Sequence, residues 1–272
     1  MVCRSPVELS RLRDANRLVG RILDQLRRAV APGVTTAELD ALAEEQIRAA
    51  GAVPAFKGYR GYPATICASV NEEVVHGIPS GRALGEGDIV SIDLGVRLEG
   101  FYGDSAVTVP VGAVSERAAA LIRVTEESLW KAIAIVRAGA RVSDIGHAVQ
   151  THVEAHGFSV VREFVGHGIG AALHEEPQVP NFGEPGRGPR LAEGMVLAIE
   201  PMVNMGRPEI RIQRDGWTAV AKDGSLSAHF EHTVAVTADG AEVLSLPPGD
   251  GRPGPSGVAA GGARTGLQPA RS

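Results

Sequence analysis

Four acidic side chains stand in apolar, strand-like segments of the sequence. Asp93 lies within IVSIDLGV and Asp104 within FYGDSAVTV. Glu200 follows MVLAI, and Glu231 precedes HTVAV. Buried acids rarely lack a partner. No Lys or Arg stands in the strand of Asp93 up to Val96, or next to Glu200, so we expect a metal ion rather than an ion pair to be that partner.

The first two carboxylates are predicted to share one hairpin. Leu98, Glu99 and Gly100 form the only turn signal between Asp93 and Asp104. A hairpin centred on these residues places the two aspartates directly opposite each other on one face, with Cβ atoms about 5 Å apart, where like charges repel. A positive group is therefore needed between them.

Histidine supplies the other common ligand type. His167 stands in VGHGIG, between glycines that let a ligand approach the backbone closely, and His174 follows seven residues later. Four carboxylates would balance two divalent cations, and one imidazole adds a neutral ligand. Such an oxygen-rich set without a thiolate favours Mn, Fe or Co and admits Zn. Paired cations about 3.5 to 4 Å apart activate water and polarise a carbonyl, so hydrolysis is the expected reaction class.

Helices followed by strands, twice over, must position these residues. Apolar residues at helical spacing predict an opening helix that ends near Pro32 and Gly33, and Thr35 with Glu38 predicts the capped start of a second helix. A second helix pair is expected around Gly139, the first of the two ending near residue 138 and the second at Gly157. Strands are predicted over 89–96, 104–109, 196–203 and 230–236.

The repeated order predicts an α+β domain with duplicated halves. The separations Gly33 to Gly51 and Gly139 to Gly157 are both eighteen residues. We expect residues 1–246 to form this single domain. Residues 247–272 are rich in Pro and Gly and poor in large apolar residues, so they are predicted to be a disordered tail.

Composition excludes several classes of function. The chain is 44% hydrophobic and 22% charged, typical of a soluble globular protein, and no stretch approaches the roughly 18 apolar residues of a membrane span. The net charge of −5 argues against a general nucleic-acid binder. Two cysteines, Cys3 and Cys67, predict no structural disulfide and fit a reducing compartment. A cytoplasmic location is expected.

The sequence resembles type I methionine aminopeptidases from about residue 6 to residue 246. The resemblance is carried, in the family's order, by NEEVVHGIP, IDLGV, GDSA, GHGIG, HEEPQVPN, IEPMV, DGWTAV and SLSAHFEHT. It implies a pita-bread fold, in which two pseudo-twofold halves share a central antiparallel sheet. It also implies removal of the initiator methionine from nascent polypeptides, with a preference for a small second residue.

The resemblance also implies roles for the candidate residues. Asp93 would bind one metal ion, and His167 and Glu200 the other. Asp104 and Glu231 would bridge the two ions. Glu200 would in addition relay a proton from the attacking water. The implied cofactors are two divalent ions, which could be Co, Mn, Fe or Zn.

Further residues match the family's substrate site. His76 and His174 would hydrogen-bond the scissile peptide. The apolar methionine pocket would be lined by Tyr59, Tyr62, Cys67 and Trp217. Cys67 is equally consistent with a small buried hydrophobe. His229 shares the strand face of Glu231, so it either approaches the site or is a structural residue. The expected partners are nascent N-termini, at the ribosome, and the chain is expected to be a monomer.

Some features depart from the family or leave alternatives open. Arg60 stands where many members have histidine, and Leu173 precedes His174 where the family often has an aromatic residue, which bears on substrate range. His147, His152 and His156 are interpreted as surface or structural residues. A proline-directed peptidase is the nearest rival, although its extra N-terminal domain is not expected here. A catalytically dead binding protein and a metal-stabilised scaffold are the others.

Overall fold

A computed structural model describes residues 2–246 of the chain. The helices are α1 (Pro6–Ala29), α2 (Thr36–Ala49), α3 (Glu116–Ile135) and α4 (Val142–Ala155), with a 3₁₀ turn η1 at Tyr59–Gly61. The strands are β1 (Val53–Pro54), β2 (Ile66–Val70), β3 (Glu73–Val75), β4 (Ile89–Leu98), β5 (Phe101–Pro110), β6 (Ser159–Val160), β7 (Gly166–Gly168), β8 (Glu175–Val179), β9 (Val196–Ile199), β10 (Met202–Asn204), β11 (Ile210–Ile212), β12 (Ala219–Ala221), β13 (Ser227–His229), β14 (Glu231–Val236) and β15 (Ala241–Val243). The predicted tail, 247–272, lies outside the described residues.

The two predicted helix pairs are present. Ser5 with Glu8 and Thr35 with Glu38 form capping boxes that satisfy the first backbone amides of α1 and α2. The third helix ends at Ile135, slightly before the predicted position, because Val136 already has an extended backbone. Each helix pair packs on its own apolar core, one with α1 and α2 and the other with α3 and α4.

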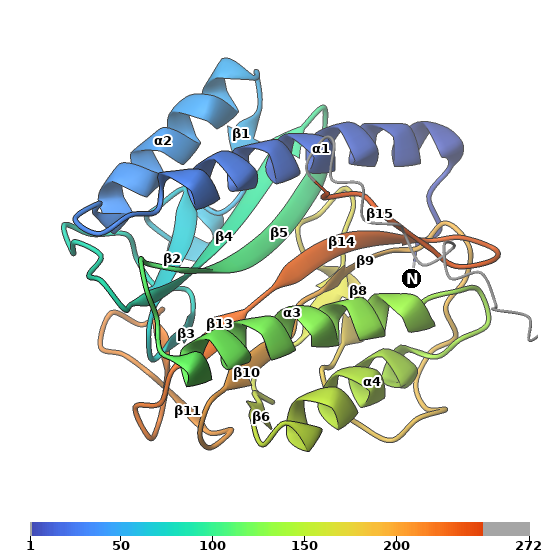
Figure 1. Ribbon diagram of the computed structural model, residues 1–272. Helices are drawn as coiled ribbons and strands as arrows, with labels where there is room; N and C mark the ends of the chain where they lie inside the picture. The colour runs from blue at the N-terminus through green and yellow to red at the C-terminus, as the bar shows by residue number, and fades with distance from the viewer. Residues whose placement is uncertain (1, 247–272) are drawn as a thin grey trace, which may run out of the picture.

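A nine-stranded sheet joins the two halves. Its order is β1-β4-β5-β14-β9-β7-β8, with β2 paired to β4 and β15 to β14, and the strand pairs within it are antiparallel. Figure 1 shows α1 and α2 over the half that holds β4 and β5, and α3 and α4 over the half that holds β14 and β9. The predicted α+β class and central antiparallel sheet are confirmed.

Alternation along the strands assigns each face of this sheet. On β4, Ile92 and Leu94 pack into the core of α1 and α2. On β14, Val234 and Val236 pack into the core of α3 and α4. Because successive strand residues point to opposite faces, Asp93 lies on the face of β4 opposite to Ile92 and Leu94, and Glu231 lies on the face of β14 opposite to Val234 and Val236.

The predicted register of the β4–β5 hairpin is wrong by two positions. The loop has two residues, Glu99 and Gly100, with φ of 47° and 87°, the left-handed conformations of a type I′ turn. Gly95 therefore pairs with Asp104, and Asp93 pairs with Ala106. The two aspartates remain on the same face as diagonal neighbours rather than direct partners.

The predicted strand over 196–203 is also corrected. It is broken at Pro201 into β9, which belongs to the nine-stranded sheet, and β10, which belongs to a three-stranded sheet with β13 and β6. Proline cannot donate to a strand ladder, so the change of sheet falls at this residue. Glu200 consequently lies in the break between the two strands rather than inside one.

Candidate metal centre

The structure brings the five predicted metal ligands together at the middle of the sheet. Glu231 of β14 is in register with Ala106 of β5, and His167 of β7 is in register with Ala198 of β9. One ligand atom each of Asp104, His167 and Glu231 lies within 4.8 Å of the others. The first half of the chain therefore contributes two carboxylates, and the second half contributes the imidazole and two more.

Glu200 and Asp93 border this buried triad. The Oε1 atom of Glu200 lies 3.5 Å from Nε2 of His167, and the side chain of Glu200 is 14% exposed. Asp93 lies close enough to Asp104 for each carboxyl to shift the pKa of the other. Asp93 and Glu200 are half-buried, whereas the triad is buried, so the site is open on one side.

Three carboxylate oxygens at this centre have no hydrogen-bond partner among the described residues. They are Oδ1 of Asp93, Oδ1 of Asp104 and Oε1 of Glu231. Buried polar atoms of native proteins are normally satisfied. Oxygens that are buried, unpartnered and gathered with an imidazole fit divalent cations, which supply the charge and the coordination that the protein does not.

The pKa values also indicate that the site requires a cation. Burial raises the pKa of Asp93 to about 7, and burial together with neighbouring carboxylates raises the pKa of Asp104, Glu200 and Glu231 well above the usual range. Burial lowers the pKa of His167 to about 4. The centre therefore favours a neutral imidazole, and its carboxyl groups become stable anions only beside a cation.

The tautomer of His167 follows from its hydrogen bond. Nδ1 lies 2.9 Å from the carbonyl oxygen of Gly168, to which it donates, so Nε2 keeps its lone pair toward Glu200. The glycines beside it are needed for packing. A Cβ on Gly166 would lie 2.4 Å from the carbonyl oxygen of Ala198, and one on Gly168 would lie 2.5 Å from that of Glu176.

A layer of polar residues that the sequence analysis missed holds the ligand strands. Asn16 of α1 is fully buried and accepts a hydrogen bond from the backbone amide of Asp104 at 3.3 Å. Thr233 donates to the carbonyl of Asp104 at 2.8 Å, and Ser105 donates to the carbonyl of Glu231 at 2.6 Å. Asn16 could have been noticed, since it is the one polar residue on the apolar stripe between Leu12 and Val19.

Two further predicted histidines lie near the centre: His174 is beside His167, and His76 is close enough to His229 to lower its pKa. The ring centroid of His174 lies 4.3 Å from that of His167, and its Nδ1 lies 2.9 Å from the hydroxyl of Tyr59. His76 packs edge-on against Phe164 with centroids 5.2 Å apart. Burial lowers the pKa of His76 to about 4 and also lowers that of His174, so both rings are neutral near pH 7.

The predicted methionine pocket forms one apolar cluster beside the centre. Tyr62 and Trp217 meet edge to face with centroids 5.2 Å apart. Cys67 is buried in the same cluster and pairs across β2 and β4 with Asp93. Leu173 is 3% exposed and packs there as well. Arg60 lies outside it, with its guanidinium carbon 5.4 Å from the Tyr59 ring centroid.

His229 approaches the centre, and His232 does not share its face. Nε2 of His229 lies 3.8 Å from Oε2 of Glu200, and its side chain is 2% exposed. Burial lowers the pKa of His229 to about 3, so this ring is neutral too. His232 instead lies 2.9 Å from the hydroxyl of Ser245, measured from its Nδ1.

Comparisons with protein families, curated proteins and solved structures all find metallopeptidases. The model of metallopeptidase family M24 matches residues 10–238. Methionine aminopeptidase 1 of Bacillus subtilis is 52% identical over 245 residues, which cover 90% of this chain and 99% of that protein. The crystal structure of a methionine aminopeptidase from Thermotoga maritima is similar with a TM-score of 0.89 at 47% identity, covering 90% of this chain and 99% of that one.

More distant structures share the fold alone. A Xaa-Pro dipeptidase from Bacillus anthracis is similar with a TM-score of 0.74 at 21% identity, and the match covers 90% of this chain but 62% of that protein. The pita-bread fold that the sequence resemblance implied is therefore the fold observed.

Proposed function

The chain belongs to metallopeptidase family M24, and from this premise we propose that Asp93, Asp104, His167, Glu200 and Glu231 hold two divalent cations for the removal of N-terminal methionine. The metal-dependent aminopeptidase activity itself rests on the match to methionine aminopeptidases over nearly their whole length. The observation that carries the proposed site is the set of unpartnered, buried carboxylate oxygens gathered around His167. Co, Mn, Fe and Zn all suit these ligands.

The cations and the side chains have separate tasks. When bound, two divalent cations lower the pKa of a water molecule and polarise the scissile carbonyl. The carboxyl group of Glu200, which lies between Nε2 of His167 and Nε2 of His229, accepts a proton from the attacking water and returns it to the leaving amine.

His174 and His76 are placed to orient the peptide. When the Tyr59 hydroxyl donates to Nδ1 of His174, the proton of the ring is on Nε2, which then serves as a donor to the substrate carbonyl. His76 supplies a second neutral donor or acceptor. The adjoining cluster of Tyr59, Tyr62, Cys67 and Trp217 suits an unbranched thioether, which packs well against aromatic rings.

The test is methionine release from Met-Ala and Met-Lys peptides by metal-depleted protein, with Mn, Co, Fe or Zn added back. We expect metal-dependent release from Met-Ala, little release from Met-Lys, and loss of release in Asp104→Ala. No release with any metal, despite a native far-UV spectrum, would favour the scaffold. Cleavage of Xaa-Pro but not Met-Ala peptides would favour the proline-directed peptidase.

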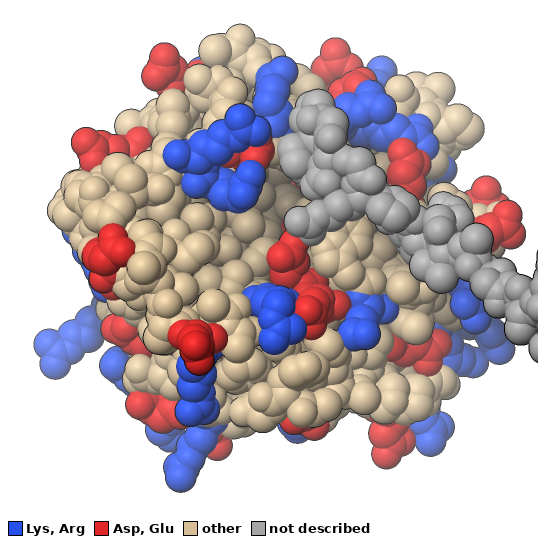
Figure 2. Space-filling view, in the orientation of Figure 1, with Lys and Arg blue, Asp and Glu red and all other residues tan. Residues whose placement is uncertain are grey.

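The wider setting is also proposed. Residues 1–246 act as one catalytic domain on nascent N-termini in the cytoplasm, near the ribosome, and the chain works as a monomer. No helix among residues 2–246 is long and apolar enough to cross a membrane, and Lys, Arg, Asp and Glu are interspersed on the face seen in Figure 2. A dimer in size-exclusion chromatography with light scattering would contradict the monomer.

A further inference from the structure

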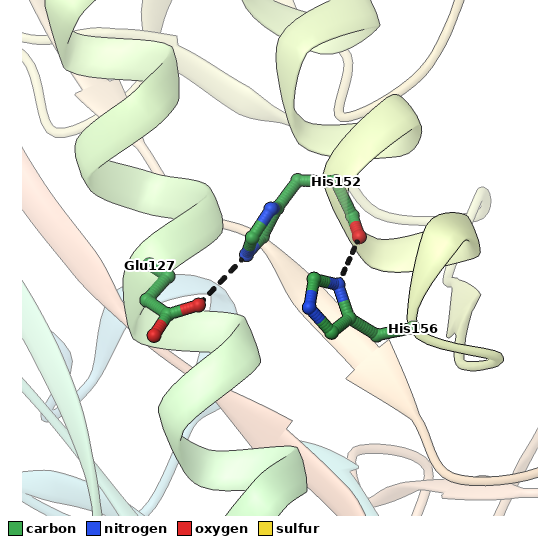
Figure 3. Close-up of side chains that lie close together, drawn as sticks. All are labelled: Glu127, His152 and His156. Carbon is green, nitrogen blue, oxygen red and sulfur yellow. Dashed lines mark hydrogen bonds and ion pairs between the residues drawn. The ribbon is translucent and has the colours of Figure 1, made fainter.

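A second group of metal-binding side chains lies on the helical side of the sheet. Glu127 projects from α3, His152 from the last turn of α4, and His156 caps the end of α4. Figure 3 shows the Glu127 carboxylate and the His152 ring pointing toward one another, with the His156 ring beside them. One ligand atom of each residue lies within 4.8 Å of the others.

The spacing of the two histidines explains their proximity. Residues four apart on a helix lie on the same face one turn apart, and the two ring centroids are 4.5 Å apart. Across the helix interface, Nε2 of His152 lies 3.0 Å from Oε2 of Glu127. The α3–α4 packing therefore brings a third ligand to a histidine pair that the sequence alone places together.

The hydrogen bonds of His152 and His156 leave the Nε2 atom of each ring directed toward a possible cation site. Nδ1 of His156 lies 2.8 Å from the carbonyl of His152 and donates to it, so Nε2 of His156 keeps its lone pair. His152 carries a proton on Nε2 when it bonds to Glu127. A cation would take the place of this proton, which passes to Nδ1 of the same ring or to solvent.

We propose that Glu127, His152 and His156 form a surface site for Zn²⁺ or a divalent ion of its class. Two imidazole nitrogens and one carboxylate oxygen make a three-ligand set that leaves one position for water. The set has too few oxygens for Ca²⁺ or Mg²⁺ and no thiolate. The bound ion joins the end of α4 to α3.

Nearby cations set the strength of the site. Arg123 lies 2.9 Å from Oε1 of Glu127, the oxygen that His152 does not contact, and Lys131 lies close enough to His152 to disfavour its charged form. Glu127 therefore binds through one oxygen. The half-buried His152 and the exposed His156 are reached from solvent without opening the core.

The proposal predicts that the chain binds one zinc ion in addition to those at the metal centre. The test is Zn²⁺ titration of the full chain by calorimetry, with retained zinc measured after gel filtration. His156→Ala removes an exposed ligand, and His147→Ala, on the same helix but bonded toward Gly183, is the matched control. We expect native protein and the His147→Ala variant to hold one equivalent more than His156→Ala, or to bind that equivalent at least about tenfold more tightly.

Diffraction at the zinc edge supplies a direct answer. An anomalous peak between α3 and α4 in crystals grown with Zn²⁺, absent from His156→Ala crystals, would support the site. Equal zinc stoichiometry and affinity in the three proteins, or a peak at the metal centre alone, would overturn it. His152→Ala, which removes the ligand shared with Glu127, should reproduce the result of His156→Ala.

Discussion

The two clusters of proposed metal ligands use the same residue types in opposite settings. At the metal centre, Asp104, His167 and Glu231 are buried, and two of the three have an oxygen with no hydrogen-bond partner within residues 2–246. Between α3 and α4, Glu127 and His152 are half-buried and already bonded to each other. The comparison teaches that desolvation decides how strongly a cation is required. The buried carboxylates of the first cluster raise the free energy of the folded protein when no cation is bound, whereas the second cluster is stable with or without one.

Matched histidine variants of the two clusters should give the largest difference, which is in the rate of methionine release. His167→Ala removes a proposed ligand of the metal centre, and we expect methionine release from Met-Ala to fall at least about a hundredfold even at saturating Mn²⁺. His156→Ala removes a ligand of the helix cluster and should leave the rate within about twofold. Initial rates on the purified variants, with melting curves as a control, measure both. Equal losses would show that the two clusters are not separate in function.

Metal removal should make stability fall with rising pH. In metal-free protein the four carboxyl groups have raised pKa values, with Asp93 at about 7, so the folded state binds more protons than the unfolded chain. Their contribution to stability is therefore lost as pH rises. Buried His76, His167 and His229, with pKa values of about 4, 4 and 3, act oppositely, but only below about pH 6.5.

The useful window therefore opens above about pH 6.5, where the histidines no longer contribute and the carboxyl groups, with the pKa of Asp93 raised to about 7, still do. Each one still protonated in the folded protein lowers the free energy of unfolding by about 1.4 kcal/mol per pH unit. Urea unfolding of chelator-treated protein should show this decline, and Mn²⁺ should remove most of it. His152→Ala should not change the slope. A flat profile without metal would contradict the assigned carboxyl environment.

Two arginines extend the comparison with smaller effects. Arg4 forms an ion pair with Glu175 in which the two side chains are 6% and 16% exposed, whereas Arg123 and Glu127 are 57% and 40% exposed. Arg4→Ala leaves a largely buried carboxylate and should lower the free energy of unfolding by roughly 2 kcal/mol.

Arg123→Ala breaks a solvated pair and should change stability by less than about 1 kcal/mol. Denaturant melts of the two variants under one set of metal and salt conditions make the comparison. Because Glu175 follows His174 directly, the Arg4 variant should also release methionine more slowly. A larger stability loss from Arg123→Ala would reverse the expected order.

The sequence predicted the elements and the candidate ligands better than it predicted their pairing. The helix caps at Thr35 and the strands around Asp93 and Asp104 depend on local patterns that short segments carry. The hairpin register depends on where the loop is centred. The loop at Glu99 and Gly100 lies one residue later than a pairing of Asp93 with Asp104 requires, which moves every cross-strand pair by two positions.

Contacts between distant segments were the least predictable. Neither the bond from Asn16 to the amide of Asp104 nor the approach of Glu127 to His152 follows from periodicity, because each depends on how two elements dock. Pro201 did signal the break that separates β9 from β10, but the apolar run around it masked that signal. Local sequence patterns thus predict the secondary-structure elements, but they do not predict how distant elements pack against each other.

The strand order has a consequence for the making of the enzyme. β14 pairs with β5, and the partners Glu231 and Ala106 are 125 positions apart in the sequence. Such distant pairing makes folding slow, since a long loop must close first. During translation, Asp93 and Asp104 leave the ribosome long before Glu231 is added. An enzyme that acts on the N-termini of new chains can thus assemble its own metal centre only after residue 231 has been synthesised.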